Sequence, residues 1–149
     1  MSTVHVTTVI RAPVERVWET VMDPNRLKDW VTIHRWVRDI SSQPMREGST
    51  MYQGLHLRGM PIHVHWKLVD VDAPRHAEWE GQGPAHSRAR IRYELSADGD
   101  DATSFDYTNE FTPPGGRLGT IASRMIVGDA SEREAQHSLT RLKALLEKN

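Results

Sequence analysis

Hydrophobic and polar residues alternate along most of the chain, and the period of the alternation marks the elements. Residues 3–10 (TVHVTTVI) predict a strand whose shared face is formed by Val4, Val6, Thr8 and Ile10. After Pro13 the apolar residues recur at helical spacing, which predicts a helix that buries Val14, Val17, Trp18, Val21 and Met22. Asp23 can cap a second short helix that has Pro24 at its first position and ends near Trp30.

The middle of the chain alternates with a period of two. Gly, Pro, Asp and Ser turn signals divide it into six predicted strands, at residues 34–41, 49–59, 61–72, 76–83, 87–96 and 103–111. One-sided alternation is typical of an antiparallel sheet with one solvated face. The inward face is expected to carry Trp66, Trp79, Tyr93, Tyr107, Asn109 and Phe111, with Met51, Gln53, Leu55 and Leu57 as candidates from their strand.

The last part of the chain returns to helical spacing. From Arg117 to about Lys148 there is no proline, which predicts one long C-terminal helix. One stripe along it is apolar at both ends and interrupted at Gly128 and Glu132. Its members are Leu118, Ile121, Met125, Gly128, Glu132, Ala135, Leu139, Leu142 and Leu146.

Composition narrows the class of protein. The chain has 149 residues, of which 38% are hydrophobic and 26% charged, values that suit a single globular domain spanning residues 1–149. A formal net charge of −1 argues against nucleic acid as a partner. The chain lacks a run of about 18 apolar residues, so no integral membrane segment is expected.

Cysteine usage and the first residues give an expectation of where in the cell the protein is located. The absence of cysteine excludes disulfides, thiolate catalysis and zinc–thiolate sites, and it fits a cytoplasmic location. The opening residues MSTVHVTTV do not have the pattern of a secretory signal. We therefore expect a cytoplasmic protein that is a monomer or a homodimer.

The order of elements and four stretches carry a family resemblance. A strand, two short helices, six antiparallel strands and a long C-terminal helix make up the helix-grip layout. The stretches are VIRAPVERVWETVMDP, Trp30, FTPPGGRLGTIASRM and SLTRLKALLEK. They resemble the SRPBCC (START/helix-grip) superfamily, in particular its bacterial polyketide cyclase/dehydrase and lipid-transport branch.

The resemblance implies an α+β fold in which a seven-stranded curved antiparallel sheet, two short helices and one long C-terminal helix enclose a cavity. In such a fold Trp18 would anchor the first helix in the core. Trp30 would lie near the cavity mouth, either in the core or in the pocket wall. The ligand-binding candidates are Trp30, Trp66, Trp79, Asn109, Phe111, Ile121 and Met125, although the same aromatic residues could instead fill a solid core.

Four residues are candidates for catalysis. Glu132 would direct a carboxylate at the sheet, where desolvation raises its pKa and suits it to acid–base work; alternatively it reaches solvent or pairs with an arginine. Tyr93 and Tyr107, together with Asn109, could polarise a carbonyl or phenol oxygen, or could satisfy buried backbone groups. His34 could transfer protons near neutral pH.

Two further patterns have plainer interpretations. His63 and His65 share one face of a strand, a spacing that can chelate a metal, but they lie opposite Trp66 and lack a third ligand. Neither a metal nor a cofactor is therefore expected. The basic run at residues 88–92 is expected to pair across strands with Glu78, Glu80, Asp106 and Glu110.

Three functions are compatible with these observations. The leading hypothesis is binding of a hydrophobic or aromatic small molecule in an internal cavity, by a protein like a cofactor-free polyketide cyclase, aromatase or dehydratase. The alternative is a non-catalytic carrier or sensor of a lipid or other hydrophobic ligand. A third is a partner-binding module like the activators of the Hsp90 ATPase. The sequence leaves open whether the protein is an enzyme.

Overall fold

One curved antiparallel sheet dominates the computed structural model, which describes residues 2–57, 59–112 and 129–148. Within these residues the sheet has seven strands in the order β1-β7-β6-β5-β4-β3-β2. The strands are β1 (Ser2–Ile10), β2 (His34–Arg38), β3 (Thr50–Leu57), β4 (Met60–Asp72), β5 (His76–Gln82), β6 (Arg88–Ala97) and β7 (Thr103–Thr112). Six of them match strands predicted from the period-two alternation, and the first matches the β-branched N-terminal run.

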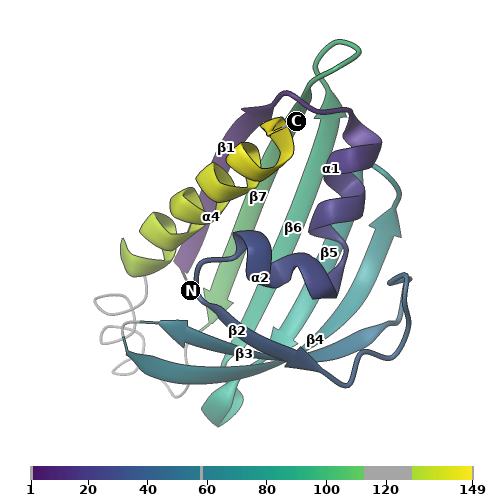
Figure 1. Cartoon of the computed structure of the whole chain (residues 1–149). Coiled ribbons are helices and arrows are strands. Elements are labelled where there is room, and N and C mark those ends of the chain that lie inside the picture. Colours follow the sequence, from purple (N-terminus) through teal and green to yellow (C-terminus); the bar gives the residue numbers. More distant parts are fainter. Residues whose placement is uncertain (1, 58, 113–128, 149) are drawn as a thin grey trace.

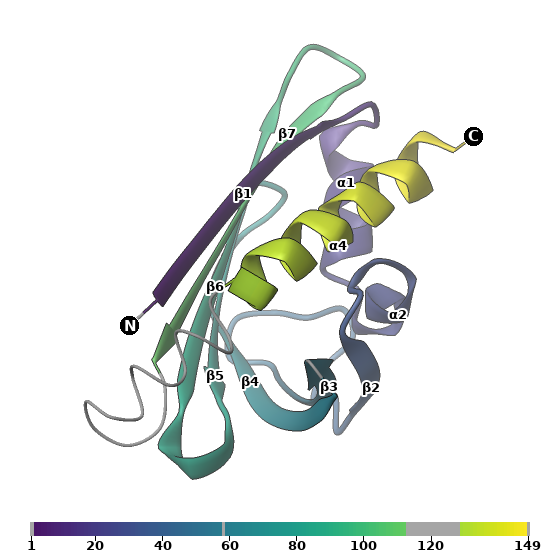
Figure 2. The ribbon, with the colours of Figure 1, turned by 90° about the vertical axis from the view of Figure 1, so that its left-hand side faces the viewer.

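The helices lie on one side of this sheet. Figures 1 and 2 show α1 (Val14–Val21), α2 (Leu27–Trp30) and α4 (Asp129–Glu147) on the concave side, inside the curl formed by β2, β3 and β4. Short 3₁₀ helices, η1 (Pro24–Arg26) and η2 (Pro84–His86), precede α2 and β6. As the sequence predicts, Asp23 caps η1: its carboxylate accepts a hydrogen bond from the Asn25 backbone N–H at 2.9 Å.

Two irregularities let the sheet curl, and a glycine lets a tryptophan ring lie against it. The β4–β5 register shifts between Leu68 and Asp70, and the β2–β3 register shifts between His34 and Trp36. Such bulges bend a strand and increase its twist. On β5, a Cβ atom at Gly81 would lie 2.6 Å from the ring of Trp66, so only glycine lets this indole lie directly over the strand. The concave surface is therefore shaped by local backbone features.

The two longer helices bury the faces that the sequence assigns to them. Val17 and Val21 of α1 are buried, and Trp18 is partly buried against the same core. On α4, which packs against β1 and α2, the buried apolar residues are Ala135, Leu139, Leu142 and Leu146. The predicted stripe is thus confirmed from Ala135 onward. Its earlier members Leu118, Ile121, Met125 and Gly128 lie outside the described residues.

The sequence left two positions open for Glu132, facing the sheet or in solvent, and the structure shows the second. This residue lies in the first turn of α4, and its side chain is exposed. Helical spacing relates Glu132 to Ala135, but it does not show where along the helix the contact with the sheet begins. Burying an unpaired carboxylate is costly, so an acidic residue at the end of a packed stripe remains in solvent.

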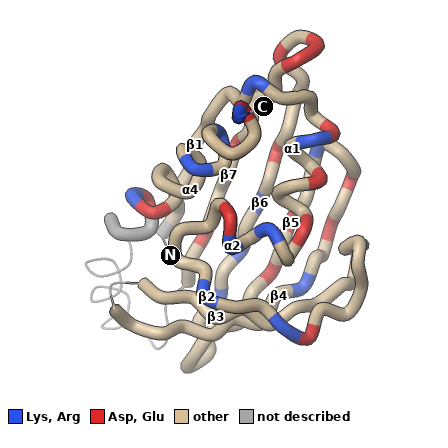
Figure 3. The backbone as a smooth tube through the Cα atoms, viewed as in Figure 1, with Lys and Arg blue, Asp and Glu red and all other residues tan. Residues whose placement is uncertain are grey.

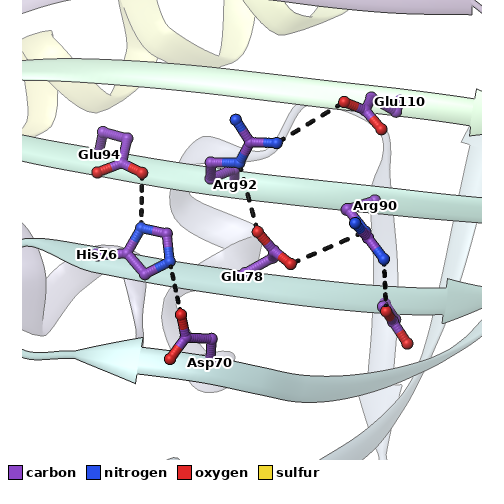
Figure 4. A network of polar contacts seen from close by, with 8 residues as sticks. Asp70, His76, Glu78, Arg90, Arg92, Glu94 and Glu110 are labelled. Carbon is purple, nitrogen blue, oxygen red and sulfur yellow. Dashed lines mark hydrogen bonds and ion pairs between the residues drawn. The ribbon is translucent and has the colours of Figure 1, made fainter.

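The convex face is polar and joined by ion pairs across strands. Arg90 contacts Glu80 at 2.7 Å and Arg92 contacts Glu78 at 3.4 Å, which confirms the cross-strand pairing predicted for the basic run (Figure 4). Acidic and basic positions are interspersed along the chain rather than separated by sign (Figure 3). Among the described residues, none of the helices has both the length and the apolar character needed to cross a membrane.

Candidate ligand cavity

A cavity of about 170 Å³ lies between the concave face of the sheet and the helices α2 and α4. Every strand from β3 to β7 contributes to its wall, because alternate residues of each strand point to this side. Most lining side chains are aliphatic or aromatic. The polar ones are Gln53, Asn109, Glu134 and Ser138, with the indole N–H groups of Trp30, Trp66 and Trp79 and the phenols of Tyr93 and Tyr107.

Aromatic rings pack together at one end of the cavity. Trp30 meets Tyr93 and Phe105 edge-to-face, with ring centroids 6.3 and 6.5 Å apart. Tyr93 in turn packs against Tyr107 at 6.1 Å. Trp30 is only 2% exposed and also lines the cavity. It therefore belongs both to the core and to the pocket wall, the two places that the sequence left open for it.

Burial determines the protonation state of the two phenols. It raises the pKa of Tyr93 strongly, and the neighbouring Tyr107 adds to the effect. Burial also raises the pKa of Tyr107 to about 12, although a side-chain hydrogen bond with Asn109 opposes part of the shift. A raised pKa keeps a phenol protonated. At neutral pH both groups are therefore hydrogen-bond donors, suited to hold a carbonyl oxygen.

A buried hydrogen-bond chain fixes the tautomer of His34. The Trp66 indole N–H, which can only donate, donates to Gln53 Oε1 at 2.8 Å. Gln53 therefore directs its amide nitrogen at His34 Nδ1, 2.9 Å away, and this ring nitrogen must accept. Neutral His34 then carries its proton on Nε2. Partial burial, with a smaller effect from Arg35, lowers the pKa of His34.

Three other polar atoms at the cavity have no partner. Trp30 Nε1, Trp79 Nε1 and Asn109 Oδ1 are buried without a hydrogen bond to any described residue, and all three residues line the cavity. Buried polar groups in proteins are nearly always paired, so each exception calls for an explanation. The three atoms are themselves buried, so they lie behind the cavity surface and do not by themselves indicate a ligand.

Two polar residues of the cavity wall, Glu134 and Ser138, make contacts that the sequence did not predict. The segment between α2 and β2 is tied to α4, because the Thr32 hydroxyl donates to Glu134 and the Thr32 backbone N–H donates to Ser138 Oγ at 3.0 Å. Glu134 and Ser138 are four residues apart and each directly precedes a buried apolar residue of α4. That spacing is the one sequence signal that could have placed them in the cavity wall.

The sequence-predicted site residues divide into four groups. The structure brings Trp30, Trp66, Trp79, Tyr93, Tyr107, Asn109 and Phe111 to the cavity wall. His34 stands one hydrogen bond behind that wall, through Gln53. Glu132 is exposed and does not line the cavity, whereas Glu134, two residues later, does. Ile121 and Met125 lie outside the described residues.

The histidine pair of β4 lies on the convex face. His65 stacks on Tyr52 with ring centroids 4.1 Å apart, and the Tyr52 hydroxyl lies 3.3 Å from His63 Nδ1. In the part of the chain that the structure describes, no three His, Cys, Asp or Glu side chains converge as a metal site requires. A larger hollow of about 630 Å³ on this face is lined mainly by polar and charged side chains, so the mainly apolar inner cavity is the better site for an apolar ligand.

A curved antiparallel sheet that grips a helix across an apolar cavity defines a helix-grip protein. The chain belongs to the polyketide cyclase/dehydrase and lipid transport family, whose model matches residues 1–147. The Zhui aromatase/cyclase from Streptomyces sp. R1128 superposes with a TM-score of 0.83 at 17% identity, covering 98% of this chain and 93% of that one. A START superfamily protein from Mycobacterium smegmatis gives a TM-score of 0.78 at 15% identity and covers 99% of both chains.

Curated relatives match only part of the chain. Two Mycobacterium tuberculosis proteins that are each named a toxin are 24% identical over 79 residues, which is 53% of this chain and 55% of each relative. The match therefore spans about half the length of these relatives. At such identities the solved structures establish the helix-grip fold, and the family model establishes membership.

Proposed function

We propose that this protein binds a small apolar or aromatic molecule in the cavity between the sheet and α4. The observation that carries the proposal is a cavity whose wall is mainly aliphatic and aromatic but includes a few polar groups, among them the phenols of Tyr93 and Tyr107. Such a wall matches the general character of small-molecule sites, in which a few polar groups fix orientation. The family description, which joins cyclase, dehydrase and lipid transport, supports the same kind of ligand.

Cofactor-free chemistry on a ketone is a second candidate function, and the adjacent phenols of Tyr93 and Tyr107 favour it. Both remain protonated at neutral pH, so they can hold a carbonyl oxygen as it becomes an enolate. The proton leaving the neighbouring carbon would pass to the Glu134 carboxylate in the same wall. Deuterium exchange at C2 of 1-tetralone in D₂O, compared with Tyr107→Phe, would separate such an enzyme from a carrier.

The convex face gives less support to a partner-binding module. In the described residues its ion pairs connect β5, β6 and β7. The large apolar side chains exposed among those residues are Val9 and Met60, 42% and 55% exposed, which lie on different strands. Two isolated residues do not form the continuous apolar patch that protein docking requires.

The binding proposal is tested by adding naphthalene to the whole protein. Trp30, Trp66 and Trp79 line the cavity, so occupancy should change tryptophan emission with saturation at one molecule per chain. Native mass spectrometry before and after organic extraction would report any co-purified compound. Ile91→Phe, which places a larger side chain on the cavity floor, should abolish the response. Absence of saturable binding by the unmodified protein would overturn the proposal.

A further inference from the structure

We infer that two copies of this protein associate through β1, whose free edges pair as antiparallel strands and join the two sheets into one. This association does not involve the cavity and goes beyond the proposed function. β1 and β2 are the edge strands of the described sheet. Three observations carry the inference: the direction of the β1 backbone groups, the part of the edge that α4 leaves open, and the composition of the strand.

The hydrogen-bond pattern of the sheet shows which residues of β1 direct their backbone groups at the free edge. The Leu95 N–H on β6 donates to the carbonyl of Arg75, which directly precedes β5, so the backbone groups of Leu95 face away from β7. Leu95 lies opposite Phe105 on β7, and facing residues of antiparallel strands alternate between bonded and non-bonded pairs, so the backbone groups of Phe105 face β1. Phe105 lies opposite Thr8, which therefore bonds to β7. The odd-numbered residues of β1 accordingly face the free edge.

The helix α4 occupies one end of this edge and leaves the other end open. The Val9 carbonyl accepts a hydrogen bond from Lys143 Nζ at 2.7 Å, as expected for a group that points away from β7. Among the described residues, none bonds to the backbone groups of Thr3, His5 or Thr7. In Figure 2, which turns the left-hand side of Figure 1 to the viewer, β1 is visible along its whole length. Three residues therefore offer both an N–H and a carbonyl to a further strand.

The composition of β1 does not protect its edge. Protected edge strands are short, carry charged side chains or proline, or contain a bulge. β1 has nine residues, pairs with β7 without a register shift, and contains no Lys, Arg, Asp, Glu or Pro in its sequence STVHVTTVI. The opposite edge strand β2 has five residues, a register shift after His34, and two arginines, Arg35 and Arg38. Of the two edges, β1 is therefore the one suited to accept another strand.

A second copy of the chain is the partner whose edge fits. An antiparallel pair formed about a two-fold axis is self-complementary, because each strand offers the same groups to the other. All three open residues are used when the axis passes beside His5, so that His5 faces its own counterpart and Thr3 faces Thr7 of the second copy. Each of these facing pairs exchanges two backbone hydrogen bonds. Val4 then lies opposite Val6, which adds a β-branched pair on the other face.

The absence of cysteine from the chain permits a direct test of this register. Oxidation of His5→Cys should give a disulfide-linked dimer, because facing Cα atoms of a bonded pair are about 5.5 Å apart, within disulfide reach. Thr3→Cys is the matched control, at an equally exposed position of the same edge. Its counterpart in the second copy would lie roughly 14 Å away, so it should not link to itself. An equal mixture of Thr3→Cys and Thr7→Cys should link, as non-reducing electrophoresis would show.

Sedimentation equilibrium tests the association without a cross-link. Over a range of protein concentrations the unmodified protein should form a species of twice the 17.0 kDa chain mass. His5→Pro removes an N–H that the β1–β7 ladder does not use, and proline is tolerated at such edge positions, so the fold should be retained. The symmetric pair loses two hydrogen bonds, so the Kd of the dimer should rise about thirtyfold. His5→Thr keeps the N–H and should remain dimeric.

The outcomes separate this inference from the binding proposal. His5→Pro should keep the circular dichroism and the naphthalene response of the unmodified protein, because β1 edge groups do not line the cavity. An unmodified protein that stays monomeric up to its solubility limit would overturn the inference. A dimer that His5→Pro leaves unchanged, or a Thr3→Cys that links to itself as readily as His5→Cys, would overturn it as well. The cysteine experiment decides the case if the proline variant does not fold.

Discussion

At the scale of single residues, the polar atoms of the cavity wall differ in whether they already have hydrogen-bond partners. Gln53 is 5% exposed and has both ends of its amide occupied, by Trp66 and by His34. A half-satisfied buried network is unfavourable, so the loss of one member should affect the others. The protonation state of His34 is therefore coupled to the position of Trp66 in the cavity wall.

His34 should make the protein less stable in mild acid. Its pKa lies below the ordinary value of 6.5, so between the two values the unfolded chain binds more protons than the folded one. The free energy of unfolding should therefore fall as the pH drops through and below 6.5. Protonation also turns Nδ1 into a donor facing the Gln53 amide nitrogen.

Urea denaturation at pH 7.5 and 5.5 checks this prediction. His34→Gln keeps an acceptor for Gln53 without a titrating ring, so it should show a smaller loss of stability between the two pH values than the unmodified protein. His137→Gln, at an exposed position of α4, is the control and should retain the full loss. An unchanged pH dependence in His34→Gln would contradict the coupling.

Strand alternation predicted the facing of single residues well, and helical spacing did less well. A period of two leaves only two faces, so Trp66, Tyr93 and Asn109 were placed on the cavity side from the sequence. The hydrogen-bond chain from Trp66 to His34 was not predictable, because it joins β2, β3 and β4 through side-chain geometry. That the Trp79 indole N–H lacks a hydrogen-bond partner among the described residues was likewise not predictable, because it depends on which groups of other elements lie nearby.

At the scale of elements, α4 is held in place near both of its ends. Near the C-terminal end, Glu147 accepts hydrogen bonds from Lys143 and from the Arg11 backbone N–H, and these contacts lower the pKa of Glu147 to about 2. Nearer the N-terminal end, Thr32 contacts Glu134 and Ser138. The first set of contacts lies beside β1, whereas Glu134 and Ser138 of the second set line the cavity, so of these two sets the second is expected to affect ligand entry.

Thr32→Val should accelerate ligand release. The substitution removes the hydroxyl that contacts Glu134 but keeps the side-chain volume and the backbone N–H that bonds Ser138. One hydrogen bond contributes about 1 kcal/mol, so the release rate should rise about fivefold. Stopped-flow dilution of naphthalene-loaded protein, followed by tryptophan emission, measures this rate.

Thr140→Val is the matched control for this experiment. Among the described residues, the Thr140 hydroxyl bonds only to the Gln136 carbonyl of its own helix, on the exposed side of α4. Its release rate should equal that of the unmodified protein. Equal rates in Thr32→Val and Thr140→Val would show that the mouth opens elsewhere.

Elements themselves were largely predictable from the sequence, but their contacts were not. The period-two runs and the helical stripe gave the strands and the described part of α4, because these patterns reflect burial against a single sheet. The sequence did not show where along α4 the sheet contact begins, so it could not decide between the two positions left open for Glu132. Thr32 and Glu134 are 102 positions apart, and local periodicity carries no information over that distance.

At the scale of the whole molecule, the curvature of the sheet creates the cavity. The bulges in β4 and β2 bend the sheet around α2 and α4 without filling the space between them, and Gly81 leaves room for the Trp66 ring. A void of about 170 Å³, at about 24 cal/mol per Å³, corresponds to a cost on the order of 4 kcal/mol as an upper value. A protein selected only for stability would fill this space, so the void itself is evidence of a binding role.

Filling the cavity should therefore stabilise the protein while it abolishes binding. Ile91 lies on the floor between Trp79 and Asn109, and Ile91→Phe adds volume where no side chain now packs. We expect the free energy of unfolding to rise by about 1 kcal/mol, the usual gain from filling a cavity, together with loss of the naphthalene response.

Val9→Phe adds similar volume at a position that is 42% exposed and should change neither quantity. If Ile91→Phe were less stable than the unmodified protein and still bound naphthalene, the floor would not be where the ligand lies. Higher stability without binding would show that the empty space is kept for a ligand at the expense of the fold.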